Sequence, residues 1–118
     1  MKKTLAVMFT LPMLLSSLAI PVLADNVAEG KKIAFQRRGT SGVGNCLACH
    51  AIADGESPGN MGPPLVAIKA RFPNRNDLRA RLYDPTVANP ISAMPPFGKH
   101  GILTDEEIEK VIDYLYTL

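Results

Sequence analysis

The sequence predicts a small all-α protein with a single domain. Its 118 residues leave room for one domain, since domains hold roughly 100 to 200 residues. Apolar residues recur at helical spacing over residues 26–36 and 104–118, and no stretch alternates apolar and polar residues as a half-buried strand does. Glycines and prolines crowd the stretches between, where they favour loops.

Residues 1–24 have the layout of a secretory signal. Two lysines stand ahead of residues 4–24, a run without a charged side chain that ends in the letters V-L-A. A basic start, an apolar middle and a small-residue site resembling A-x-A are typical of such signals. We therefore expect cleavage after Ala24, with residues 25–118 as the mature domain in the periplasm.

An uncleaved membrane anchor is the alternative interpretation of this run. The run is long enough to cross a bilayer, which takes about 20 residues, but Pro12 and Pro21 interrupt it. Cleavage would also remove both lysines of the signal, which leaves equal numbers of basic and acidic residues and a net charge of zero. Binding to phosphate backbones needs a basic excess, so the sequence disfavours a nucleic-acid partner.

The first half of the mature domain is expected to hold one clear helix. Spacing predicts it over residues 26–36, and a glycine-rich connector follows over 37–44. Residues 55–64 carry too many glycines and prolines for a regular element. Residues 65–70 are expected to form one or two helical turns.

Two more helices are predicted in the second half. Asn74 or Asn76 caps the first, which runs to about Tyr83 and is stopped by Pro85. Residues 84–103 contain four prolines and no periodicity, and a loop of this length in a compact domain usually has a function.

The C-terminal helix is the clearest element of the sequence. Thr104 followed three residues later by Glu107 forms a capping box at its start. One apolar face follows, made of Ile108, Val111, Ile112 and Leu115.

The chemistry lies in residues 46–50, which read C-L-A-C-H. Two thiols separated by two residues can add to the two vinyl groups of a haem, and a histidine directly after them can bind the iron. The motif therefore predicts one covalent haem c, attached to Cys46 and Cys49 with His50 as an iron ligand.

Three other interpretations of the motif remain open. A thioredoxin-type disulfide calls for a βαβ pattern, which the sequence does not show. A zinc site calls for four ligands, and His100 and scattered carboxylates are all that remain to complete it. A plain structural disulfide leaves His50 without a role.

The second iron ligand is sought among Met94, Met61 and His100. Met94 is the expected ligand, because it follows His50 by 44 residues and the adjacent prolines of A-M-P-P-F stiffen its loop. Met61 lies only 11 residues past His50, too few to cross easily to the other haem face, so we interpret it as a packing residue. His100, beside a lysine and a glycine, is expected to be a solvated loop residue. Core filling remains the alternative for Met94.

The run G-P-P-L at residues 62–65 follows the C-L-A-C-H motif closely enough for its backbone to contact the His50 ring. A backbone carbonyl there, from Pro63, could accept the free ring N–H of His50 and orient the imidazole. A simple turn is the commonest meaning of so short a motif.

Together, C-L-A-C-H, G-P-P-L, A-M-P-P-F and the capped C-terminal helix resemble the class I mono-haem cytochromes c over essentially the whole mature chain. The resemblance implies N- and C-terminal helices that cross beside the haem, with Gly30 at the crossing facing Leu115 and a tyrosine, Tyr114 or Tyr116. Two departures stand out: Ala34 replaces the usual aromatic residue, with Phe35 beside it, and residues 37–45 form a long insert.

A narrower resemblance, to the SoxX family of small cytochromes, rests on the longer runs G-N-C-L-A-C-H, G-N-M-G-P-P-L and N-P-I-S-A-M-P-P-F-G-K-H-G-I-L-T. It implies a heterodimer with a larger cytochrome of SoxA type, which couples thiosulfate oxidatively to a cysteine of the carrier SoxYZ. The small subunit would accept electrons and have no catalysis of its own within this L-cysteine S-thiosulfotransferase. The alternatives are a free electron shuttle to a terminal oxidase or, without haem, a structural disulfide-linked binding module.

A basic cluster has two interpretations. It consists of Arg71, Arg75, Arg79 and Arg81. A solvated helix face, with one arginine near a haem propionate, is the simpler interpretation. A docking surface for an acidic patch on a redox partner is the other.

Overall fold

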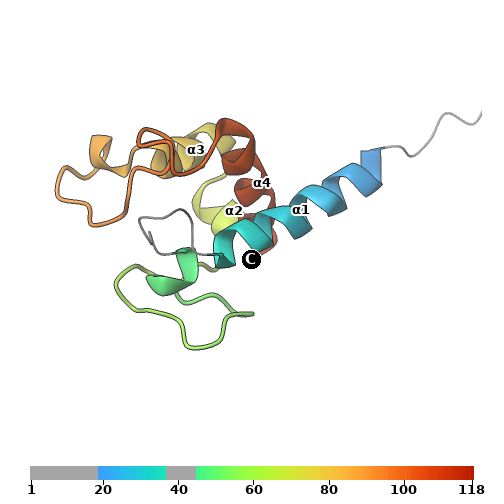
Figure 1. The fold of residues 1–118 in the computed structure, drawn as a ribbon, viewed down its shortest axis with the longest axis horizontal. Helices are drawn as coiled ribbons and strands as arrows, with labels where there is room; N and C mark the ends of the chain where they lie inside the picture. Colours follow the sequence, from blue (N-terminus) through green and yellow to red (C-terminus); the bar gives the residue numbers. More distant parts are fainter. Residues whose placement is uncertain (1–18, 37–44) are drawn as a thin grey trace, which may run out of the picture.

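The computed structural model describes residues 19–36 and 45–118, and this part of the chain is all-α, as predicted (Figure 1). The helices are α1 (Ala19–Phe35), α2 (Ile68–Arg71), α3 (Arg75–Tyr83) and α4 (Asp105–Leu115), with 3-10 turns η1 (Cys46–Ala48) and η2 (Pro85–Val87). Within the described ranges, no helix is long and apolar enough to cross a membrane. The connector at 37–44 and most of the predicted signal lie outside the described residues.

Helix α1 begins earlier than the predicted start at residue 26. No glycine or proline stands between Val22 and Glu29 to end a helix, and leucine and alanine are strong helix formers. The side chains of Val22 and Leu23 are exposed, so the first turns of α1 extend beyond the packed domain (Figure 1). Cleavage after Ala24 stays a prediction.

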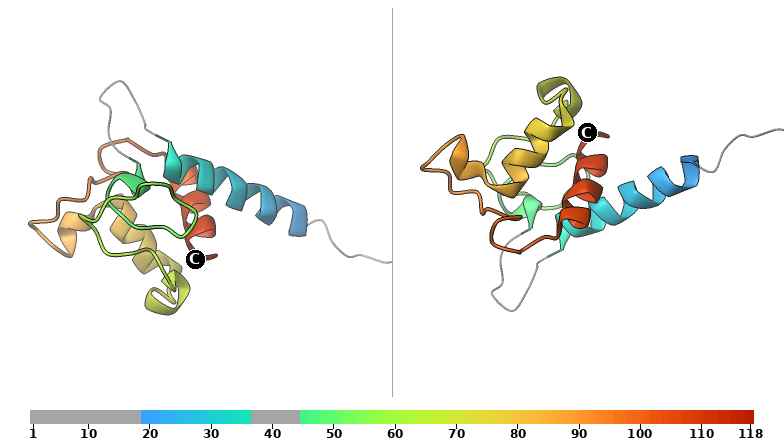
Figure 2. Two further views of the ribbon diagram at one scale, coloured as in Figure 1. Left: turned by 90° about the horizontal axis from the view of Figure 1, so that it is seen from below. Right: turned by 90° about the horizontal axis from the view of Figure 1, so that it is seen from above.

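Helices α1 and α4 cross and pack against each other, as the views in Figure 1 and Figure 2 agree. The two helices approach closely at Gly30, where an added Cβ would lie 1.9 Å from the carbonyl oxygen of Lys110 and 3.1 Å from Cβ of Tyr114. The expected tyrosine is therefore Tyr114, and the three atoms nearest to the added Cβ belong to Lys110 and Tyr114 rather than to Leu115. Phe35 meets the Tyr114 ring edge-on at 6.2 Å, which supplies an aromatic contact beside Ala34.

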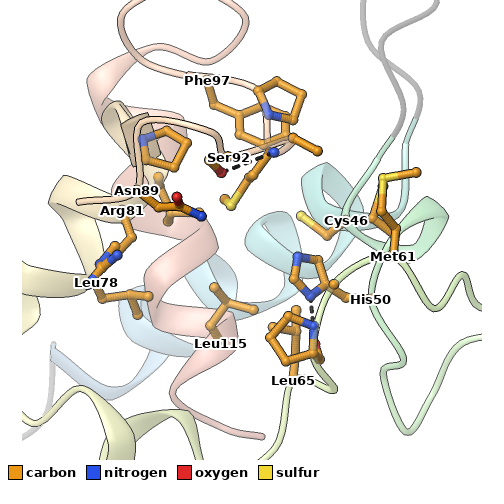
Figure 3. Close-up of a pocket in the computed structure, with 18 of the residues that line it drawn as sticks. Cys46, His50, Met61, Leu65, Leu78, Arg81, Asn89, Ser92, Phe97 and Leu115 are labelled. Atoms are coloured by element: carbon orange, nitrogen blue, oxygen red, sulfur yellow. Dashed lines mark hydrogen bonds between the residues drawn. The ribbon is translucent and has the colours of Figure 1, made fainter. Parts of the chain in front are cut away.

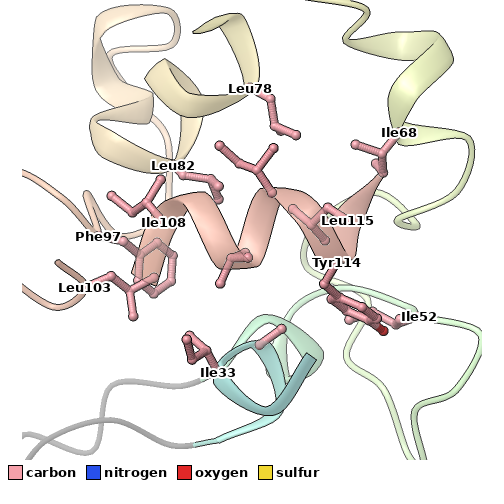
Figure 4. Close-up of a cluster of buried hydrophobic side chains, with 13 residues drawn as sticks. Ile33, Ile52, Ile68, Leu78, Leu82, Phe97, Leu103, Ile108, Tyr114 and Leu115 are labelled. Atoms are coloured by element: carbon pink, nitrogen blue, oxygen red, sulfur yellow. The ribbon is translucent and has the colours of Figure 1, made fainter. Parts of the chain in front are cut away.

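The core is built around α4, whose predicted apolar face is buried (Figure 4). Ile108, Val111 and Ile112 are fully buried, and α4 packs against both α1 and α3. Both halves of the predicted capping box at Thr104 and Glu107 are present. The cap defines where α4 starts, and its buried face supplies the packing.

The shorter helices differ little from expectation. Helix α2 is one short helix at Ile68–Arg71, so it overlaps the second half of the predicted segment 65–70 and ends one residue beyond it. Asn74 caps α3, its side chain accepting a hydrogen bond of 3.0 Å from the backbone N–H of Asn76. The segment after α3 is a long loop, as predicted, although it begins with the 3-10 turn η2.

Candidate haem site

The C-L-A-C-H motif is shaped by η1 and its cap. The Asn45 side chain accepts a hydrogen bond of 2.9 Å from the backbone N–H of Ala48 and donates one to the carbonyl of Phe35, which ties the motif to the end of α1. The backbone N–H of His50 donates to the carbonyl of Cys46 at 2.9 Å. Both cysteines and the histidine therefore lie on one tight turn.

The His50 ring is held by the G-P-P-L run. Its Nδ1 lies 2.6 Å from the carbonyl oxygen of Pro63, and since a carbonyl can only accept, Nδ1 carries the proton. The other ring nitrogen, Nε2, then has its lone pair available for a metal, and it faces the cavity in Figure 3. This is the orienting bond suggested by the spacing of the sequence.

Gly62 holds the same ring by contact, a feature that sequence reasoning missed. A Cβ at Gly62 would lie 2.3 Å from Cε1 of His50, so the backbone passes directly against the imidazole. The backbone N–H of Gly62 also donates to the carbonyl of Cys49 at 2.7 Å, and this bond holds the G-P-P-L run against the C-L-A-C-H motif. The position of Gly62 directly before two prolines was the sequence signal that could have predicted this close approach.

A cavity of about 590 Å³ opens beside His50. Its walls are mostly apolar, with Leu65, Leu78 and Leu115 among them. Figure 3 shows Leu115 of α4 at its floor, with His50 and Cys46 on one side and the loop residues Ser92 and Phe97 on the other. Cofactor sites usually measure about 300 to 1,000 Å³, so the cavity is of the right size for a prosthetic group.

Met94 and Met61 both line the cavity. Met94 lies in the loop opposite His50 and packs against the core, and its backbone N–H donates to Ser92 Oγ at 3.2 Å. Met61 lies on the His50 side, beside Cys46 (Figure 3). Met61 is 73% exposed and is not among the residues packed against the core, contrary to the expectation that it is a packing residue. His100 is exposed and is not among the cavity-lining residues.

The basic cluster divides into two pairs. Arg75 and Arg79 of α3 are engaged with α4, where Glu109 receives a hydrogen bond of 2.7 Å from Arg75 and one of 3.1 Å from Arg79. Arg71 and Arg81 line the cavity instead, and Arg71 donates to the carbonyl of Pro64 at 3.1 Å. The four arginines therefore do not form one cluster: two are paired with carboxylates of α4 and two lie beside the cavity.

The environment of Cys46 argues against a redox dithiol. Burial raises the pKa of the Cys46 thiol to about 11, with a smaller contribution from Cys49, so the thiolate is scarce at neutral pH. Thioredoxin-type cysteines have a lowered pKa instead.

The donor set fits a haem. Cys46 and Cys49 would supply two thioether bonds, and His50 an imidazole nitrogen, at the edge of an apolar cavity with a methionine loop opposite. A zinc site fits poorly, since among the residues with described positions no three His, Cys, Asp or Glu side chains are grouped to hold a metal ion. The fold and the donor set together define a c-type cytochrome.

Comparison with known proteins places the chain in a family. Residues 25–115 match the model of cytochrome c oxidase, cbb3-type, subunit III, and the chain belongs to this cytochrome c family. It is also 37% identical over 87 residues to an uncharacterized lipoprotein of Aquifex aeolicus (strain VF5). The matched region is 72% of this chain but 42% of that protein, so the chain spans less than half the length of this relative. The protein is thus a c-type cytochrome and an electron carrier.

Covalent attachment gives a direct test of the motif. If Cys46 and Cys49 both form thioethers, haem stays on the polypeptide through denaturing electrophoresis, and the pyridine haemochrome spectrum is of c-type. Cys46→Ala together with Cys49→Ala should abolish the haem stain, whereas His100→Ala should leave it unchanged. Release of haem from the unaltered protein under these conditions would contradict the assignment.

Proposed function

We propose that this cytochrome is the electron-transfer subunit of a periplasmic SoxAX-type complex, with His50 and Met94 as its two iron ligands. The support for a partner is an exposed apolar rim at the cavity: Met61 and Ile91 line the cavity and are 73% and 91% exposed, and Val87, 83% exposed, lies in η2 with the lining residue Pro85. Exposed apolar side chains around a cofactor cavity are typical of a surface that a partner covers.

The chain's own residues would have distinct roles. A haem bound here supplies one-electron redox chemistry. His50, oriented by Pro63 and Gly62, and Met94, presented by the opposite loop, would set the reduction potential. Ligation by a thioether raises that potential because it favours the reduced state.

The conjugation of thiosulfate would belong to the larger partner. Both cysteines of the sequence are in the haem motif, so neither remains to carry sulfur. The chain would accept the electrons released when thiosulfate is joined to the SoxYZ cysteine, without catalysis of its own.

A location outside the cytoplasm has two supports. Residues 1–24 have the layout of an export signal, and the Aquifex relative is named a lipoprotein. We place the mature protein in the periplasm, and a lipid-anchored form is the variant that the relative's name suggests.

A second candidate is a free electron shuttle to a terminal oxidase. The family's description as a subunit of cytochrome c oxidase favours it. The two candidates differ in their interface, since a shuttle needs a transient contact of less than about 1,200 Å² whereas a permanent subunit buries more.

Gel filtration of the native periplasmic protein distinguishes the two. We expect a stable heterodimer with a larger haem protein, and thiosulfate-dependent conjugation only in the assembled pair. Ile91→Glu should weaken the heterodimer at least about tenfold, because it places a charge at the apolar rim. The control Val66→Glu changes an exposed valine that does not line the cavity, and it should have little effect. A solitary monomer that gains no activity from a SoxA-type partner favours the shuttle.

A further inference from the structure

The loop opposite His50 is closed at its base by two contacts. Asp84 Oδ2 accepts a hydrogen bond of 2.7 Å from Lys99 Nζ, and the backbone N–H of Lys99 donates to the carbonyl of Tyr83 at 3.1 Å. Residues 84–99 thus form a compact surface loop with adjacent ends, a class that spans about 6 to 16 residues. Met94 lies within it.

Asp84 is the buried member of this closure. It is 7% exposed, while the Lys99 side chain is 56% exposed. Its other oxygen, Oδ1, accepts hydrogen bonds from the backbone N–H and the hydroxyl of Thr86, which cap η2. The bonds from Lys99 and Thr86 lower the pKa of Asp84, so the carboxylate is ionised at neutral pH.

A series of hydrogen bonds runs from this base to Met94. The backbone N–H of Asn89 donates to the carbonyl of Pro85 at 3.0 Å, and that of Ser92 donates to the carbonyl of Asn89 at 2.9 Å. The backbone N–H of Met94 then donates to Ser92 Oγ at 3.2 Å. Each bond fixes the next turn of the loop relative to its base.

Between Pro85, which is buried at the start of the loop, and Met94, apolar packing contributes little on this side of the loop. Val87 and Ile91 are both largely exposed, and Phe97, beyond Met94, is the buried anchor of the other arm. On the N-terminal arm of the loop, the position of Met94 therefore depends mainly on the Asp84–Lys99 pair and on the hydrogen bonds that lead from it. We propose that the Asp84–Lys99 pair positions Met94, so that loss of the pair loosens the thioether from the iron without unfolding the domain.

The inference rests on the proposed ligation by Met94, and competition with imidazole tests it. In the oxidised protein, added imidazole displaces a loosely held thioether, and loss of the far-red sulfur-to-iron band reports the displacement. Asp84→Asn keeps an oxygen to cap η2 but removes the ion pair, and Lys99→Gln removes it from the other side. Both should raise the apparent imidazole affinity about three- to tenfold, the effect of one partly exposed charge-assisted bond.

Two further variants serve as controls. Lys99→Arg keeps the charge and should bind imidazole as the unaltered protein does. Glu106→Gln breaks the 2.8 Å pair between Glu106 and Lys110 on α4, away from the loop, and should also leave the affinity unchanged. Thermal unfolding of the same samples reports global stability, which a merely structural role would lower without an effect on imidazole binding.

The outcomes separate the two proposals. Unchanged imidazole affinity in Asp84→Asn and Lys99→Gln, with the far-red band intact, would refute the positioning role alone. An equal effect of Glu106→Gln would refute it as well. Absence of the band from the unaltered oxidised protein would refute ligation by Met94, and the positioning role with it.

Discussion

Replacing Met94 by alanine is expected to abolish the far-red band of the oxidised protein and to lower its reduction potential. Loss of the thioether removes the ligand that favours the reduced iron. Since axial ligands span about 0.8 V in haem proteins, a fall on the order of 0.2 V is expected. Visible spectra of the oxidised protein and a potentiometric titration measure the two effects.

Met61→Ala and His100→Ala are the matched controls for this experiment. Met61 is the other methionine lining the cavity but lies on the His50 side, and His100 is exposed outside it. Both variants should retain the band and the potential. If Met94→Ala retains the band, Met94 is not the ligand, and loss of the band in Met61→Ala would identify Met61 as the source of the thioether instead.

Gly30→Ala is expected to destabilise the protein although it improves helix propensity. Alanine is favoured over glycine by about 1 kcal/mol in a helix interior, so propensity alone predicts a gain. The new Cβ would lie 1.9 Å from the carbonyl oxygen of Lys110, and both atoms belong to rigid helices, so α1 and α4 must separate. Overpacking of this kind usually costs about 1 to 3 kcal/mol. Urea unfolding of the haem-loaded protein measures the net change.

The sign of the change decides between the two effects. Ala28→Gly, on the exposed face of α1, isolates propensity and should cost about 1 kcal/mol. A lower free energy of unfolding in Gly30→Ala supports the tight crossing. A higher one would show that the two helices do not meet at Gly30.

Local chemistry made some features predictable from the sequence. The capping box at Thr104 and the apolar face of α4 depend on residues three and four apart, and both are present in the structure. The same holds for the Asn74 cap of α3 and for the haem motif, whose residues lie on one turn. In each case the interacting groups are close in sequence, so their spacing determines their geometry.

Other features depended on contacts between distant segments, and the sequence could not settle them. The residues next to Met61 in the sequence do not reveal that its side chain is exposed, because exposure depends on which distant segments cover that side chain. The arginines of α3 bind carboxylates on α4, far along the chain, while Arg71 and Arg81 reach the cavity.

The sequence by itself determined the all-α class, the haem motif and the termini of the later helices. Tertiary structure alone decided that Tyr114 and the Lys110 backbone meet Gly30, that Gly62 packs against His50, and that Asp84 and Lys99 close the methionine loop. The physical reason is distance along the chain. Residues within one turn are held together by the backbone, whereas partners from separate elements meet only after the core around α4 has brought those elements into contact.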